Sequence, residues 1–148
     1  MKSAAAQAPS MSSQPETAPE IPRPKRVMLV DDSPVDAESW RTALAERYGD
    51  RVSFESYQDP LKAIPHFGPD IDLLLLDLEM PILDGRKLAA LAKERGVPCR
   101  RMVILSGHHA DELHALFPKE SCLAVINKTE REQQSAFLMI LDSIVRKP

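Results

Sequence analysis

The chain has 148 residues, of which 43% are hydrophobic and 28% charged, and its formal net charge at pH 7 is −3. This length suffices for one domain with a buried core, and the acidic balance disfavours a nucleic-acid-binding surface, which is usually basic. The longest apolar run is far shorter than a membrane span, the amino terminus lacks the apolar core of a signal peptide, and Cys99 and Cys122 are too few for a disulfide framework. We therefore expect a reduced, cytoplasmic protein.

Residues 1–24 differ in composition from the rest of the chain. They are rich in Ala, Ser and Gln and hold five of the 13 prolines. A segment with so little to bury cannot offset the entropy lost on ordering. We expect a disordered tail at residues 1–24 and a single folded domain at residues 25–148.

From residue 25 on, apolar strands alternate with helical stretches. Ser33 and Pro34 are typical of an N-cap and first helical position, and Asp59-Pro60 begins a second, short helix that Pro65 ends early. Strands are predicted at residues 26–30, 51–57, 71–77, 101–106 and 122–128, and the remaining helices at about 86–95, 111–117 and 129–145.

This alternation predicts an α/β fold. Strands that are apolar on both faces belong to a parallel sheet covered by helices on both sides. Right-handed crossovers then give a doubly wound, five-stranded sandwich. Ligands of such sheets bind beyond the carboxyl ends of the strands.

Polar residues follow the predicted strands at that edge: Asp31-Asp32, Asp77, Ser106 and Lys128. Three carboxylates close together raise one another's pKa unless a cation joins them. Oxygen ligands without His or Cys favour a hard divalent cation such as Mg²⁺. A carboxylate beside Mg²⁺ and a lysine is equipped to attack phosphorus and form an acyl phosphate.

These residues, together with the segment "DLEMPILDG" that contains Asp77, resemble the receiver domain of bacterial two-component response regulators. The resemblance extends over about residues 25–146. It implies the flavodoxin-like, CheY-like fold with strand order 2-1-3-4-5. It also implies Asp77 as the phosphoacceptor and a sensor histidine kinase or histidine phosphotransfer protein as the phosphoryl donor.

The resemblance assigns further roles around Asp77. Asp32 and Asp77 would ligate Mg²⁺ together with the backbone carbonyl of Glu79, and Asp31 would act through water. The phosphoryl group would be bound by Lys128 and by Ser106, which would also carry the switch. Glu79 and His108 would border the path of the hydrolytic water and so tune dephosphorylation.

Two positions depart from the family pattern. Val125 stands where the family usually has an aromatic residue that moves with the switch, and Thr129 stands where a proline usually follows the lysine. A cis bond before a non-proline residue costs about 3–4 kcal/mol, so we expect a trans bond there and Thr129 as a helix cap. Both departures concern the switch rather than the phosphorylation chemistry.

Three functions are compatible with these residues. The first is a stand-alone receiver in a phosphorelay that signals through phosphorylation-controlled protein binding and is no enzyme beyond its own phosphorylation and dephosphorylation. The second is a phosphorylation-independent adaptor of the same fold, which Val125 and Thr129 keep open. The third, a phosphatase with an aspartate nucleophile, is disfavoured because Glu79 replaces the second aspartate that such enzymes usually carry.

Overall fold

The computed structural model describes residues 23–81, 83, 85–107, 124–127 and 131–146. The predicted helix at 111–117 and almost all of the predicted tail lie outside these residues. Among the described residues, no helix is long and apolar enough to cross a membrane. The strands are β1 (Lys25–Val30), β2 (Val52–Tyr57), β3 (Leu73–Asp77), β4 (Met102–Ser106) and β5 (Ala124–Asn127); the helices are α1 (Pro34–Tyr48), α2 (Pro60–Ala63), α3 (Gly85–Glu94) and α5 (Arg131–Val145).

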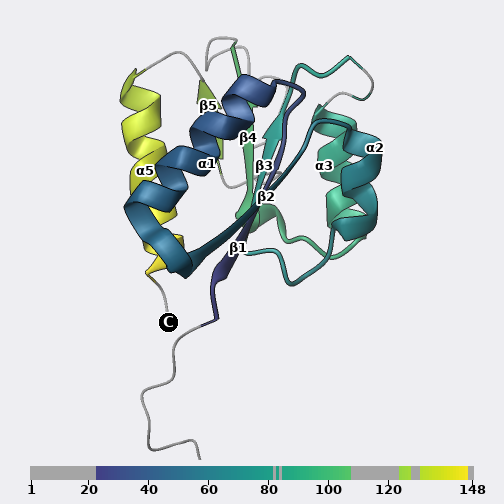
Figure 1. The fold of residues 1–148 in the computed structure, drawn as a ribbon. Helices are drawn as coiled ribbons and strands as arrows, with labels where there is room; N and C mark the ends of the chain where they lie inside the picture. The colour runs from purple at the N-terminus through teal and green to yellow at the C-terminus, as the bar shows by residue number, and fades with distance from the viewer. Residues whose placement is uncertain (1–22, 82, 84, 108–123, 128–130, 147–148) are drawn as a thin grey trace, which may run out of the picture.

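The five strands form one parallel sheet in the order β2-β1-β3-β4-β5. Helices α1 and α5 cover one face of the sheet, and α2 and α3 cover the other (Figure 1). The predicted doubly wound α/β fold and its strand order are confirmed. Because all strands run the same way, their carboxyl ends reach the same edge.

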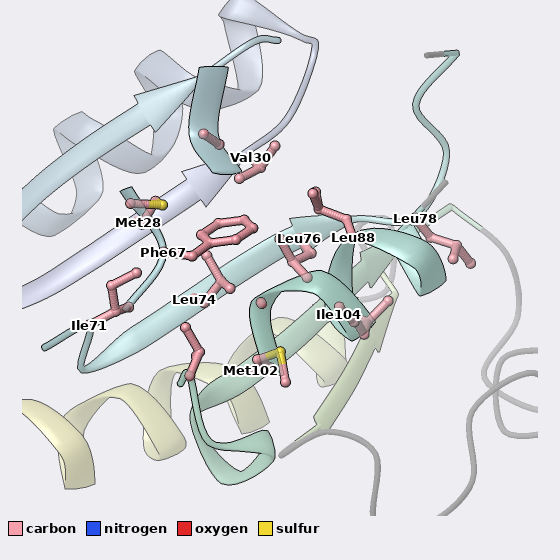
Figure 2. Packing of buried hydrophobic residues seen from close by; sticks show 14 of the residues in the cluster. Met28, Val30, Phe67, Ile71, Leu74, Leu76, Leu78, Leu88, Met102 and Ile104 are labelled. Atoms are coloured by element: carbon pink, nitrogen blue, oxygen red, sulfur yellow. The ribbon is translucent and has the colours of Figure 1, made fainter. Parts of the chain in front are cut away.

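Side chains of the three central strands alternate between two hydrophobic clusters, as the pleat of a strand requires. Leu74 and Leu76 of β3 belong to the cluster under α2 and α3, shown in Figure 2. Leu73 and Leu75 belong to the cluster under α1 and α5. All four are fully buried. The central strand therefore has a buried side chain on both faces, which fixes its position in the sheet.

The ends of the helices follow the capping residues found in the sequence. The Ser33 side chain accepts a hydrogen bond from the Asp36 N–H at 3.2 Å at the start of α1. Asp59 accepts one from the Leu61 N–H at 2.9 Å at the start of α2, which ends before Pro65 as predicted. The strand predicted at 71–77 is shorter, since the Ile71 N–H bonds back to Gly68 in a turn.

Helix α5 packs on the sheet through Phe137, Leu141 and Val145, which are buried. The ring of Phe137 meets that of Trp40 on α1 edge-on, with centroids 5.0 Å apart. Met139 of the same helix is 75% exposed. Helices α1 and α5 thus form one layer that shares a core with the sheet.

Candidate functional site

Asp31 and Asp77 lie at the carboxyl ends of two neighbouring strands. Asp31 continues the alternation of Val27 and Leu29, and its N–H donates to the Tyr57 carbonyl at 3.0 Å, which extends the pairing of β1 and β2. Asp77 continues the alternation of Leu73 and Leu75 on β3. Both carboxylates are almost fully buried, with 1% and 3% of their surface exposed.

The carboxylates of Asp31, Asp32 and Asp77 come together at this edge. Each offers one oxygen, and the three oxygens lie within 4.8 Å of one another. Asp32 is exposed, so the cluster opens to solvent on its side. The Ser33 N–H donates to Asp31 Oδ1 at 2.9 Å, so the start of α1 orients the buried acid. The predicted convergence of these three aspartates is confirmed.

This donor set fits a hard divalent cation. It consists of oxygen atoms only, carries negative charge, and is spaced closely enough for one ion to reach several of them. Burial of two of the three acids raises the electrostatic cost of leaving them without a cation. The described residues near the cluster thus match the expectation for Mg²⁺ in chemistry and in position.

The loop after β3 is held close to the Asp77 carboxylate. The Leu78 N–H donates to the Leu105 carbonyl at 2.9 Å, which continues the pairing of β3 with β4 beyond Asp77. The Glu79 N–H donates to Asp77 Oδ1 at 3.1 Å. These bonds fix both the backbone and one carboxylate oxygen of Asp77.

Gly85, the first residue of α3, packs directly against this loop. Its N–H donates to the Leu78 carbonyl at 3.2 Å. A Cβ atom at this position would lie 2.8 Å from Leu78 Cα and 3.0 Å from the Asp77 carbonyl oxygen. Only glycine permits so close an approach of α3 to the backbone that carries Asp77.

Ser106, the last residue of β4, is fully buried, and its hydroxyl donates a hydrogen bond to Glu79 Oε2. The next residue, Gly107, donates its N–H to Glu79 Oε1 at 3.2 Å. One carboxylate therefore accepts from both polar groups at the end of β4. Glu79 itself is exposed.

Some predicted site residues cannot be placed. Lys128, Thr129 and His108 lie outside the described residues. Val125 belongs to β5, where it is paired with Ile104, and its side chain is not among those described. The roles expected for these residues remain predictions.

Two contacts at the site were not predicted from the sequence. One is the pair of hydrogen bonds that the Glu79 side chain accepts from Ser106 and Gly107, at and just after the end of β4. The sequence predicts for Glu79 only a backbone carbonyl ligand and an effect on hydrolysis. The other is the close approach of Gly85 to the backbone of Asp77 and Leu78. A glycine eight residues after Asp77 is the signal that could have indicated it.

Comparison with known proteins agrees with this geometry. The family model described as "Response regulator receiver domain" matches residues 27–136, more than half of the chain. The chain therefore belongs to the receiver domain family of two-component response regulators. This confirms the resemblance predicted from the aspartates and the "DLEMPILDG" segment.

The individual relatives have low sequence identity to this chain. The transcriptional regulatory protein NatR of Bacillus subtilis is 32% identical over 92 residues, which are 61% of this chain and 38% of NatR. The chain thus matches well under half the length of that relative. The signal receiver domain of an HD domain-containing protein from Pseudomonas fluorescens Pf-5 has a TM-score of 0.67 at 18% identity, covering 86% of this chain and 91% of that one. The Mn²⁺-bound form of response regulator Rcp1 has a TM-score of 0.62 at 22% identity, covering 81% and 93%.

Proposed function

We propose that residues 25–148 act as a phosphorelay receiver that accepts a phosphoryl group on Asp77. The donor is a phosphohistidine of a sensor histidine kinase or a histidine phosphotransfer protein in the cytoplasm. The output is phosphorylation-controlled binding to another protein. The observation that carries the proposal is a carboxylate fixed at the tip of the central strand with two further carboxylates within 4.8 Å.

The transfer step follows from the position of Asp77. One Asp77 oxygen attacks the phosphorus, an O–P bond forms, and the P–N bond to the donor imidazole breaks, with its electron pair going to the leaving nitrogen. The Glu79 N–H, 3.1 Å from Asp77 Oδ1, holds the carboxylate in place during the attack. Because Asp77 is buried, little water reaches its carboxylate to compete with it for the phosphoryl group.

The remaining residues hold the cation and the phosphoryl group. Asp32 and Asp77, with the Glu79 backbone carbonyl and with Asp31 through water, would hold Mg²⁺. When bound, the ion would neutralise charge on the carboxylates and on the phosphoryl oxygens. Ser106 and Lys128 are proposed to bind the transferred group.

Two side chains and one atypical position complete the proposal. Glu79 and His108 are proposed to tune hydrolysis of the acyl phosphate. Val125 leaves the switch without the usual aromatic partner, so Ser106 and its loop are proposed to carry the signal.

The test is intact mass after incubation with Mg²⁺ and acetyl phosphate. We expect wild type to gain one phosphoryl group and Asp77→Asn to gain none. Asp50→Asn, which removes an exposed carboxylate next to the carboxyl end of α1, is the matched control and should behave as wild type. No gain in wild type, even with candidate kinases supplied, would refute the proposal and favour the phosphorylation-independent adaptor.

A further inference from the structure

The carboxyl end of β4 presents two hydrogen-bond donors toward the loop that follows Asp77. They are the Ser106 hydroxyl and the Gly107 N–H, and both donate to Glu79, one to each carboxylate oxygen. A Cβ atom at Gly107 would lie 3.7 Å from Glu79 Oε1, an ordinary van der Waals distance, which shows how closely the glutamate approaches this backbone. The two donors thus form a small anion-binding site, occupied by the protein's own carboxylate.

This site lies beside the reactive acid. Asp77 is paired with Leu105, so Ser106 and Gly107 are the next two residues along the neighbouring strand. Glu79 is two residues beyond Asp77, and its N–H is bonded to the Asp77 carboxylate. An anion attached to Asp77 would therefore meet the same two donors that Glu79 now uses.

We propose that Glu79 is a built-in competitor for the phosphoryl group, and that phosphorylation of Asp77 expels its carboxylate from Ser106 and Gly107. The inference rests on the proposed function. A hydroxyl and an N–H each have one hydrogen to donate, so they serve either the carboxylate or the phosphoryl oxygens. Two anions at one site also repel each other, which disfavours joint occupancy.

The competition identifies the part of the site that moves. Ser106 is fully buried and its hydroxyl is already engaged before any phosphoryl group arrives. Glu79 is exposed, so its side chain can swing into solvent without disturbing the core. Phosphorylation thus exchanges one anion for another at β4, and the released Glu79 side chain changes the surface beside the site.

The kinetic test measures phosphorylation by acetyl phosphate with saturating Mg²⁺ in wild type, Glu79→Gln and Glu79→Ala. Glu79→Ala removes both hydrogen bonds to the charged acceptor and should react roughly tenfold faster. Glu79→Gln removes the charge and one of the two acceptor oxygens, so its rate should lie between those of Glu79→Ala and wild type. Glu94→Gln is the matched control, because Glu94 is exposed at the far end of α3 from Asp77. It loses the same charge and should react at the wild-type rate.

A second measurement follows the contact itself by NMR. The Gly107 amide proton should shift upfield in unphosphorylated Glu79→Ala and stay in place in Glu94→Gln. Equal phosphorylation rates in wild type and the Glu79 variants would overturn the competition while leaving the proposed function intact, and so would an unmoved Gly107 signal. No phosphorylation in any chain that retains Asp77 would instead overturn both.

Discussion

At the scale of single residues, the site depends on how closely backbone segments approach Asp77. Gly85 has no side chain, and α3 therefore begins against the Asp77 carbonyl and Leu78 Cα. The bond from the Gly85 N–H to the Leu78 carbonyl closes this loop. Asp77 is thus held in position by the start of α3 as well as by its own strand.

Gly85→Ala tests this close approach. The new Cβ would lie 2.8 Å from a backbone atom, which cannot move aside as a side chain can. We expect a loss of about 1–3 kcal/mol in the free energy of unfolding, which is typical of overpacking, together with slower phosphorylation by acetyl phosphate. Urea denaturation and intact mass measure the two effects.

Gly68→Ala is the control for this prediction. A Cβ at Gly68 would lie 3.1 Å from Asp70 Oδ1, the end of an exposed side chain rather than a backbone atom. This variant should lose less stability than Gly85→Ala and should keep the wild-type phosphorylation rate. Equal losses in the two variants would contradict the role given to Gly85.

At the scale of elements, α1 and α5 are joined at their carboxyl ends by Arg47, Tyr48 and Asp142. Arg47 donates to both oxygens of Asp142, at 3.2 Å from Nε and 3.0 Å from Nη2. The Tyr48 hydroxyl donates a hydrogen bond to the same carboxylate. These bonds from Arg47 and Tyr48 lower the pKa of Asp142 from its ordinary 3.8 to about 2.

The lowered pKa predicts an acid-sensitive contribution to stability. A carboxylate whose pKa is lower in the folded state stabilises the fold above its unfolded pKa, and this stabilisation is lost as pH falls from about 4 toward 2. Asp142→Asn should therefore be less stable than wild type at pH 7, and the difference should shrink at pH 3. Urea denaturation of both proteins at pH 7, 5 and 3 measures it.

Comparing the two proteins at each pH cancels the titration of the other carboxylates they share. Asp36→Asn is a poor control because Asp36 lies in the capped first turn of α1; Asp50→Asn is better, since Asp50 is exposed in the turn after α1. A stability gap that is constant between pH 7 and pH 3 would show that Asp142 contributes through packing rather than through charge.

At the scale of the whole molecule, much of the architecture could be predicted because it follows from local patterns. The apolar run at Leu73–Leu76 predicts a strand buried on both faces. Capping residues such as Ser33 and Asp59 mark where helices begin. Since all strands of a parallel sheet end at one edge, the meeting of Asp31, Asp32 and Asp77 follows as well.

What could not be predicted depends on tertiary distances. The sequence places Glu79 and Ser106 on adjacent segments, but whether the glutamate side chain reaches the hydroxyl depends on the path of the loop after β3. The contact between Arg47 and Asp142 joins residues 95 positions apart, and no periodicity relates them. Strand ends shift by one or two residues because turns compete for the same N–H groups.

The acidic cluster links the site to the stability of the whole fold. Asp31 and Asp77 are buried next to each other and next to Asp32, and mutual repulsion of their charges opposes folding. A cation that binds the folded state but not the unfolded chain stabilises the fold by mass action. Mg²⁺ should therefore raise the temperature of unfolding. The size of the increase should depend on how many of the three carboxylates are present.

Thermal unfolding in EDTA and in Mg²⁺ tests this linkage. At ten times its Kd the ion adds about 1.4 kcal/mol, or roughly 3–5 °C in Tm for a chain of this size. Asp32→Asn, which removes an exposed member of the cluster, should unfold at a higher temperature than wild type in EDTA and gain less from Mg²⁺. Asp50→Asn, whose carboxylate lies outside the cluster, should show the wild-type gain. Binding of the ion to the cluster depends on the carboxylate charge that Asp32→Asn removes. If Mg²⁺ raised the Tm of wild type and Asp32→Asn equally, the ion would therefore be binding elsewhere.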